Sequence, residues 1–211
     1  MFVKKIQRKI KRIIDDRCRK WVIKRNENFD IIVDKDISII ASNCNGGILC
    51  KDLGLRFNSP FVNLWIRPRD FIKMLNNLKE YLEGDLQFIE SEPVDYPVAI
   101  LRDIKLYFMH YKSDIEAAEA WYRRRDRINY NDLLVMFTDR DGCTYEDLRD
   151  FDKLDYKKVV FTASRYNDIK SSFVVKEFEG CQEVGILTDY IPTKYGVRYY
   201  DSFNFKRWIE G

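Results

Sequence analysis

The sequence predicts an α/β fold, a three-layer, Rossmann-like domain with a mostly parallel (mixed) sheet and helices on both faces. Short apolar stretches alternate with stretches of helical periodicity from about residue 37 onward. The run at 133–137 is apolar at every position, as in a central parallel strand that is covered on both faces. Two apolar runs near residue 100 are separated by only two residues, which indicates an added β-hairpin.

The first 28 residues are expected to form a basic amphipathic helical arm, and residues 29–211 a single α/β domain, which is also long enough for two small lobes. Residues 1–25 contain eleven lysines and arginines against two aspartates, a local balance of +9; the remaining 26 basic and 32 acidic residues give −6. Apolar residues recur there at three- and four-residue steps and form one stripe on a helix. These residues are Phe2, Ile6, Ile10, Ile13, Ile14, Trp21 and Val22.

Such an arm has three possible roles. It can lie on an anionic membrane surface, it can bind nucleic acid, or it can pack its apolar stripe on the body. Nucleic acid is the least favoured partner, because no nucleic-acid-binding module is recognisable elsewhere in the chain.

The body begins with a short apolar strand at 37–41, followed by a loop at 42–47. A second strand is expected at 61–66. Pro68 then suits the first turn of a helix that continues to Gly84, a suitable C-terminal cap.

The middle of the chain predicts a strand at 86–89 and a hairpin formed by 97–101 and 104–109. Ser113 and Glu116 have the spacing of a capping box, so a helix is expected to begin there and to run through Tyr122.

The last part of the chain predicts the central strand 133–137, a helix at 144–154 and a buried strand at 159–161. Thr144 suits the N-cap of that helix, with Asp147 three residues later. Beyond residue 170 the pattern weakens, and we expect strands at 173–175 and 184–187 and a short helix at 201–211.

Composition favours a cytoplasmic protein, peripheral at the inner face of the membrane if the arm binds lipid. No apolar run approaches the roughly 18 residues that a membrane span needs, and the N-terminus lacks the pattern of a signal peptide. The five cysteines are scattered and odd in number, which argues against a disulfide framework and against a zinc site.

Ligands bind at the carboxyl ends of parallel strands, so the loop after 133–137 is the first candidate site. There Asp139 and Asp141 flank Arg140. Two such carboxylates can hold Mg²⁺ or Mn²⁺ and so neutralise a nucleotide diphosphate, with Arg140 contacting the substrate. The alternative is an ordinary turn that leads into the helix at Thr144.

Two further groups complete the predicted site. His110, the only histidine, falls at the end of an expected strand, where it could act as a general base or be hydrogen-bonded to backbone. The loop 42–47 offers polar side chains and backbone for substrate binding, or makes only a tight turn. Its candidate substrate-binding residues are Ser42, Asn43, Asn45, Gly46 and Gly47.

Several strings resemble one bacterial family, a domain of unknown function that is labelled for exopolysaccharide biosynthesis. These strings are SNCNGG (42–47), NSPFVNLWIRPRDFIKMLNNLKEYL (58–82), FMHYKS (108–113), DRDGC (139–143) and RYYDSF (198–203). The resemblance covers most of the chain from about residue 30 onward. It implies an α/β fold and a surface-glycan context, with no established catalytic residues to carry over.

The function expected from these observations is exopolysaccharide or capsular polysaccharide biosynthesis, by a transferase that uses a nucleotide-activated sugar. The catalytic residues would be His110, Asp139 and Asp141. One alternative is a metal-independent acyl or other group transferase that acts on a glycan through His110. A second is a non-catalytic partner of a polysaccharide biosynthesis enzyme.

Overall fold

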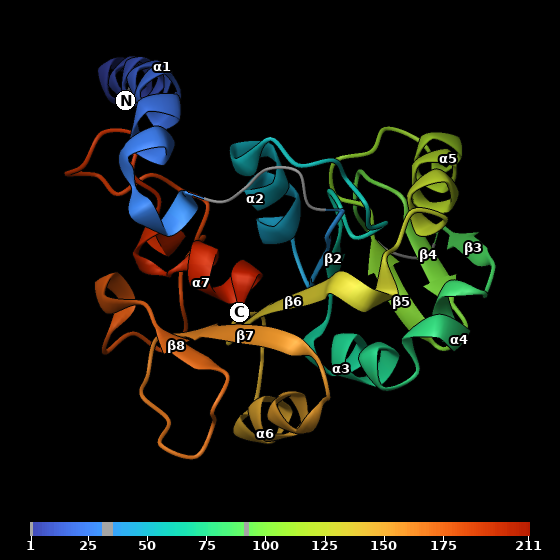
Figure 1. Cartoon of the computed structure of the whole chain (residues 1–211). Helices are drawn as coiled ribbons and strands as arrows, with labels where there is room; N and C mark the ends of the chain where they lie inside the picture. Colours follow the sequence, from blue (N-terminus) through green and yellow to red (C-terminus); the bar gives the residue numbers. More distant parts are fainter. Residues whose placement is uncertain (1, 31–35, 91–92) are drawn as a thin grey trace.

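The computed structural model describes residues 2–30, 36–90 and 93–211 (Figure 1), and it contains two four-stranded sheets. The parallel sheet has the order β1 (Ser38–Ala41), β6 (Leu133–Thr138), β7 (Lys157–Thr162), β8 (Ser172–Val174). The antiparallel sheet has the order β2 (Trp65–Ile66), β5 (Ile104–Tyr107), β4 (Val98–Leu101), β3 (Leu86–Ile89). The α/β class is therefore confirmed, whereas the single mixed sheet is wrong.

Helices occupy most of the predicted positions. They are α1 (Phe2–Arg25), α2 (Asn45–Leu53), α3 (Pro68–Asn76), α4 (Leu78–Leu82), α5 (Asp114–Arg125), α6 (Tyr145–Lys153) and α7 (Phe205–Glu210). Short 3-10 turns lie at Glu27–Phe29, Tyr130–Asp132, Lys176–Phe178 and Tyr199–Ser202. The single helix predicted at 68–84 is divided, because Asn77 leaves the helical conformation with φ −137° and ψ 47°.

The predicted hairpin lies in a sheet of its own and is not an addition to the parallel sheet. Strands β4 and β5 are joined through Ile104 and Leu101, as the spacing indicated, but their outer neighbours are β3 and β2. All four antiparallel strands lie between β1 and β6 in the sequence. The alternation of apolar residues predicts a strand but does not name its partner, so the sequence could not separate the two sheets.

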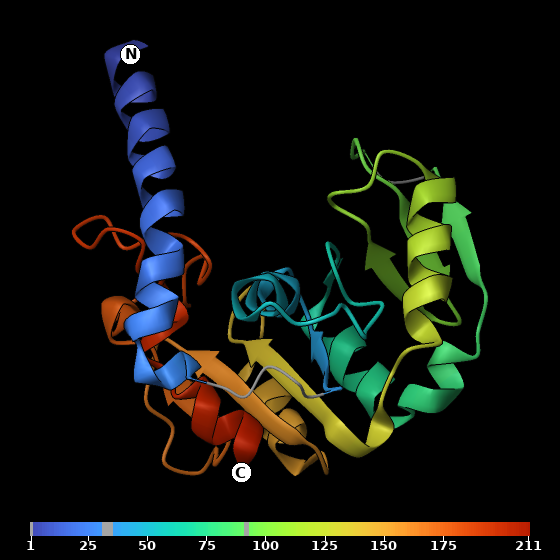
Figure 2. The same ribbon diagram turned by 45° about the horizontal axis from the view of Figure 1, so that its top comes forward.

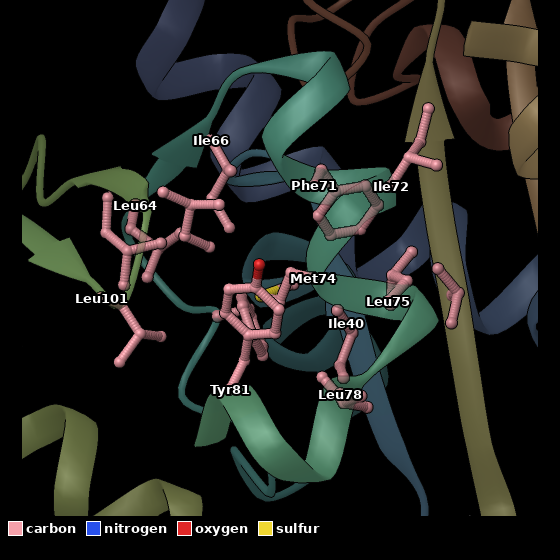
Figure 3. Close-up of a cluster of buried hydrophobic side chains, with 14 of the residues drawn as sticks. Ile40, Leu64, Ile66, Phe71, Ile72, Met74, Leu75, Leu78, Tyr81 and Leu101 are labelled. Atoms are coloured by element: carbon pink, nitrogen blue, oxygen red, sulfur yellow. The ribbon is translucent and has the colours of Figure 1, made fainter. Parts of the chain in front are cut away.

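Alternate residues of the parallel strands face two different hydrophobic cores. On β6, Val135 and Phe137 belong to one core, and Leu134 and Met136 to the other. The first core contains side chains of α3, α6 and the antiparallel sheet; the second contains side chains of α2 and α7. Figure 1 shows these two pairs of helices on opposite sides of β6 and β7. Figure 3 shows how α3 and α4 fill the first core around Ile40.

Helix α2 corrects the loop that was predicted at 42–47. Only Ser42, Asn43 and Cys44 lie outside regular structure, and Asn45 begins the helix. Gly46 lies where the helix approaches β1 most closely. A Cβ at this position would be 3.0 Å from Cβ of Ala41 and 3.3 Å from Cγ2 of Ile39. Gly46 is therefore required for packing of the helix on the strand.

We expect Gly46→Ala to lower the free energy of unfolding by about 1 kcal/mol. Overpacking typically costs about 1–3 kcal/mol, which outweighs the gain of up to about 1 kcal/mol in helix propensity. Urea denaturation measures the difference. Lys51→Ala, on the exposed side of the same helix, is the matched control and should leave stability within about 0.5 kcal/mol of wild type. A Gly46→Ala protein at least as stable as wild type would contradict this packing constraint.

The C-terminal segment crosses the second core without forming the strand predicted at 184–187. That prediction is wrong, because the backbone N–H of Val184 donates to a side-chain carboxylate, that of Asp139, at 2.8 Å. A single antiparallel bridge joins Tyr190 and Arg198. The predicted final helix is present in shorter form as α7.

Arg19 fastens α1 to the body. Its side chain is only 5% exposed, and it donates to the carboxylates of Asp52 and Asp201. The shortest N···O distances are 2.6 Å to Asp52 and 2.5 Å to Asp201, and Nη1 also donates to the carbonyl of Gly196 at 3.1 Å. Burial alone lowers the pKa of this guanidinium, but its hydrogen bonds and attraction to Asp201 raise the pKa above the ordinary value. Arg19 is therefore a fully charged, buried anchor.

The predicted amphipathic arm is a helix, but its apolar stripe does not pack on the body. Ile6, Ile10, Ile13, Ile14 and Trp21 are all exposed, whereas Val22 is half-buried. The side chain of Phe2 lies outside the described ones. In the ranges that the structure describes, no helix is long and apolar enough to cross a membrane.

Candidate functional site

The candidate site lies where β1 and β6, two neighbouring parallel strands, end side by side. Loop 42–44 follows β1, and loop 139–143 follows β6. Nδ2 of Asn43 donates to Oγ1 of Thr138, the last residue of β6, at 3.3 Å. We call these two loops and the side chains that contact them the carboxyl-edge site. The structure thus brings together two of the loops that were predicted to carry a ligand.

Helix α2 begins at this edge. Its N-cap, Cys44, makes no side-chain hydrogen bond to the first turn, while Oδ1 of Asn43 accepts from the N–H of Asn45 at 3.1 Å. The first turn of a helix carries partial positive charge, which favours an anion at this point. Burial raises the pKa of the Cys44 thiol, so the thiol stays protonated and is a poor nucleophile at neutral pH.

Asp139 is a structural tie between three segments. It is 8% exposed; Oδ2 accepts from the N–H of Ala163, at the end of β7, at 2.7 Å, and Oδ1 accepts from the N–H of Val184 at 2.8 Å. Burial raises the pKa of this carboxyl group, against the two backbone hydrogen bonds, which act to lower it. Both oxygens are thus directed at the protein interior.

Asp141 faces the other way. It has φ of +62°, which turns the chain back after Asp139, and its carboxylate is exposed. Oδ2 accepts from the indole N–H of Trp65 at 3.1 Å, and the backbone N–H donates to Oε2 of Glu183 at 3.1 Å. The two aspartates therefore do not converge on one point. Across the described residues, no group of three or more His, Cys, Asp or Glu side chains is placed to hold a metal ion. Metal binding by this pair stays a prediction.

Arg140 lies between the two aspartates and is half-buried. Its Nε is enclosed by protein and has no hydrogen-bond partner among the residues that the structure describes. Within the ranges that the structure describes, no carboxylate forms an ion pair with this side chain. A half-buried guanidinium without a counterion is a candidate for binding an anion from outside.

The antiparallel sheet supplies an aromatic wall to the site. The backbone N–H of Ile66 donates to the carbonyl of Ser42 at 2.9 Å, which places β2 beside loop 42–44. Trp65 pairs with Tyr107 across β2 and β5, with ring centroids 4.6 Å apart. The guanidinium of Arg67 lies 5.9 Å from the Tyr107 ring. Sequence reasoning missed this wall because the pairing joins residues that are far apart in the chain.

The remaining predicted residues have separate positions. His110 is exposed, beyond the end of β5, and in the described part of the chain no hydrogen bond or ion pair joins it to Asp139, Asp141 or residues 42–47. Gly46 and Gly47 lie in the first turn of α2, where a Cβ on Gly47 would be 3.1 Å from Val62. Of the predicted residues, the carboxyl-edge site includes Ser42, Asn43, Asn45, Asp139, Arg140 and Asp141.

Two open depressions flank the site. The first, of about 680 Å³, lies over the start of α6 between Arg69 and Lys153 and includes Gly142 of loop 139–143. The second, of about 560 Å³, lies between Arg165 and Ser202 over the ends of β7 and β8. Neither is lined by Asp139, Asp141 or His110.

Comparison with known proteins finds relatives that carry no described activity. Residues 16–210 match a family model described as a domain of unknown function, DUF1919. A protein of Haemophilus influenzae, described as uncharacterized, is 38% identical over 202 residues, which cover 95% of this chain and 96% of that protein. All residues of the carboxyl-edge site lie within residues 16–210, the region that the family model matches. The first fifteen residues of the arm precede this region.

Proposed function

The chain belongs to the DUF1919 family, a domain of unknown function, and from the geometry of its carboxyl-edge site we propose that it is a transferase of surface-polysaccharide assembly. In this proposal the chain acts in exopolysaccharide or capsule biosynthesis and uses a nucleotide-activated sugar as donor. The observation that carries the proposal is the half-buried Arg140, which has no carboxylate partner among the described residues and lies on the loop beside the start of α2.

Arg140 supports the binding of a diphosphate. Partial burial of an unpaired cation is unfavourable, so a bound anion compensates for the lost hydration of the guanidinium. The planar guanidinium fork matches two phosphate oxygens at once. The N-terminus of α2 adds its partial positive charge at the same edge of the sheet.

The aromatic wall supports a sugar or a base next to that diphosphate. Trp65, which is half-buried and rests against the buried ring of Tyr107, provides apolar ring surface, and Asn43 offers amide hydrogen bonds at the opposite loop. Asp141, whose exposed carboxylate is held by the Trp65 indole, is the carboxylate that an acceptor hydroxyl can reach, which makes it the candidate general base. Asp139 holds loop 139–143 in position, because its carboxylate accepts from the backbone N–H groups of Ala163 and Val184.

The proposal does not depend on a metal ion. The partners of Asp139 and Asp141 point the two carboxylates apart, so the pair as placed does not fit one shared Mg²⁺ or Mn²⁺ ion. Arg140 and the start of α2 supply positive charge without it.

We expect Arg140→Gln to weaken the binding of UDP or GDP about 10- to 100-fold. Hydrogen bonds to a charged group contribute roughly 1.5–3 kcal/mol, and glutamine cannot supply the charge. Isothermal titration calorimetry with UDP, GDP and their sugar conjugates, with and without Mn²⁺, measures the affinities. Arg207→Gln, which removes an exposed arginine on α7, is the matched control and should bind as wild type does.

The same titrations separate the alternative functions. Binding of coenzyme A in place of the nucleotide sugars, lost in Arg140→Gln, would favour acyl transfer at this site. If no nucleotide or coenzyme A binds wild-type protein, the transferase proposal is wrong, and a non-catalytic role in glycan assembly becomes the better explanation.

A further inference from the structure

The outward face of α1 carries an inference that is independent of the proposed transferase. Residues 11, 15, 18, 19, 22, 23 and 26 share one side of the helix, at about 100° per residue. On this side Asp15 and Arg19 are buried. The exposed residues 6, 10, 13, 14, 17 and 21 lie about 150° around the helix axis from it. Figure 2 shows the first turns of α1 extending beyond the rest of the chain.

The rotation of α1 about its own axis is set by the body. Oδ1 of Asp15 accepts from the N–H of Gly196 at 3.0 Å, and Arg19 is held by Asp52 and Asp201. Gly196, with φ of +71°, approaches so closely that a Cβ there would lie 2.9 Å from the backbone N of Arg19. The apolar stripe therefore cannot turn inward without breaking a buried ion cluster.

That stripe exposes five large apolar side chains on one side of the helix. The exposed fractions are 44% for Ile6, 52% for Ile10, 48% for Ile13, 40% for Ile14 and 57% for Trp21. Four isoleucines and a tryptophan on one face of one helix exceed the scattered exposed apolar side chains of an ordinary surface. A surface of this kind marks the position of a partner.

Charge identifies the chemistry of that partner. Arg17, Lys20 and Lys24 are exposed on or beside the stripe. The helix has two acids, Asp15 and Asp16, and both accept hydrogen bonds from the body. Asp15 accepts from the N–H of Gly196, and Oδ1 of Asp16 accepts from the Tyr190 hydroxyl at 2.8 Å. The outward face is thus apolar and positive, which is complementary to an apolar and negative partner.

We infer that the outward face of α1 docks on the surface of an anionic phospholipid membrane. The isoleucines and Trp21 would enter the boundary between headgroups and acyl chains, while the basic residues contact lipid phosphates. A second copy of the chain would bring the two sets of basic residues against each other without an acid to pair with them. Nucleic acid would attract the charges but would leave the isoleucines without an apolar partner.

Vesicle sedimentation of the full-length chain tests this inference. We expect binding to phosphatidylcholine vesicles that contain phosphatidylglycerol, and far weaker binding to phosphatidylcholine alone. The triple variant Ile6→Ser, Ile10→Ser, Ile13→Ser should reduce the partition coefficient at least about tenfold with every charge retained. Arg17→Gln, Lys20→Gln, Lys24→Gln should reduce it about 100-fold, at about fivefold for each cation.

Matched variants and a second measurement make the test decisive. The control Lys112→Gln, Arg123→Gln, Lys170→Gln removes three exposed charges from the body and should bind as wild type does. Brominated lipid should quench tryptophan fluorescence of the wild-type protein, and Trp21→Phe should remove most of that quenching. Because all substituted side chains are exposed, circular dichroism and thermal melting should remain unchanged.

Three results would overturn the inference. The first is equal sedimentation of the triple isoleucine variant and wild type. The second is that duplex DNA binds the isoleucine variant as tightly as it binds wild type and displaces vesicles from the wild-type protein. This result would assign the face to nucleic acid. The third is a dimer in sedimentation equilibrium without lipid that becomes a monomer in the isoleucine variant.

Discussion

Arg19→Met is expected to destabilise the protein by about 3–5 kcal/mol, the typical effect of removing one partner from a buried ion cluster. Methionine keeps much of the aliphatic volume but none of the donors. Asp52 and Asp201 would then be buried with fewer hydrogen-bond donors, since in the described ranges Asp52 would keep contacts with Tyr200 and Arg198 alone. The loss is measured by urea denaturation monitored by far-ultraviolet circular dichroism.

The control for Arg19 lies on the same helix. Arg17→Met removes an equal charge from an exposed position and should change stability by no more than about 0.5 kcal/mol. Hydrogen exchange of α1 amides then locates the loss: in Arg19→Met, protection should fall first along residues 11–25. Equal stability of Arg19→Met and Arg17→Met would show that the buried cluster does not hold the helix to the body.

Asp139→Asn is expected to destabilise the protein by about 2–3 kcal/mol, although the two side chains have nearly the same shape. The carboxylate accepts from two backbone N–H groups, those of Ala163 and Val184. An amide offers one oxygen and one NH₂ group, so one buried N–H would face a donor and lose its hydrogen bond. Thermal and urea unfolding, with and without Mn²⁺, measure the loss.

Asp141→Asn is the matched control for Asp139. Its carboxylate is exposed, and an amide oxygen can still accept from the Trp65 indole, so stability should stay within about 0.5 kcal/mol of wild type. The pair also tests the metal hypothesis. If Asp139→Asn kept full stability but lost Mn²⁺ binding, the structural role of Asp139 would be wrong and a metal role would be supported.

Elements specified by local chemistry were predicted well. Ser113 and Thr144 cap α5 and α6 through the N–H groups of Glu116 and Asp147, at the spacing seen in the sequence. Strand β6 follows from its continuous apolar run. In each case the signal lies within a few residues, where the chain's own geometry decides the outcome.

Features that depend on distant contacts were not predictable. Arg19 is one of eleven basic residues in the arm, and nothing in the local pattern separates it from Arg17. The apolar stripe predicted an amphipathic helix correctly, but the side that packs on the body is the one with Asp15 and Arg19. Charged side chains on a packing face are exceptional, so periodicity alone points to the opposite face.

The candidate site shows the same limit. Asp139 and Asp141 are two residues apart, and an extended chain would point them to the same side. The positive φ of Asp141 breaks that geometry, and the indole of Trp65 receives the second carboxylate. Loop 42–44 and loop 139–143 were placed together correctly, because parallel neighbours end at one edge. The aromatic wall could not be predicted, because the sequence does not show which strand lies beside Ser42.

The position of the antiparallel sheet between β1 and β6 also determines the order in which the molecule can be completed during synthesis. Ser38 pairs with Leu133, so the first strand of the parallel sheet has no partner until the whole antiparallel sheet and α5 have been translated. Closing so long a loop from a disordered chain is entropically costly, and an insert that is already folded shortens the gap to be closed. Strands β3, β4 and β5 of the antiparallel sheet each pair with the next strand in the chain, so this part of the insert can act as an internal scaffold on which the later parallel sheet is assembled.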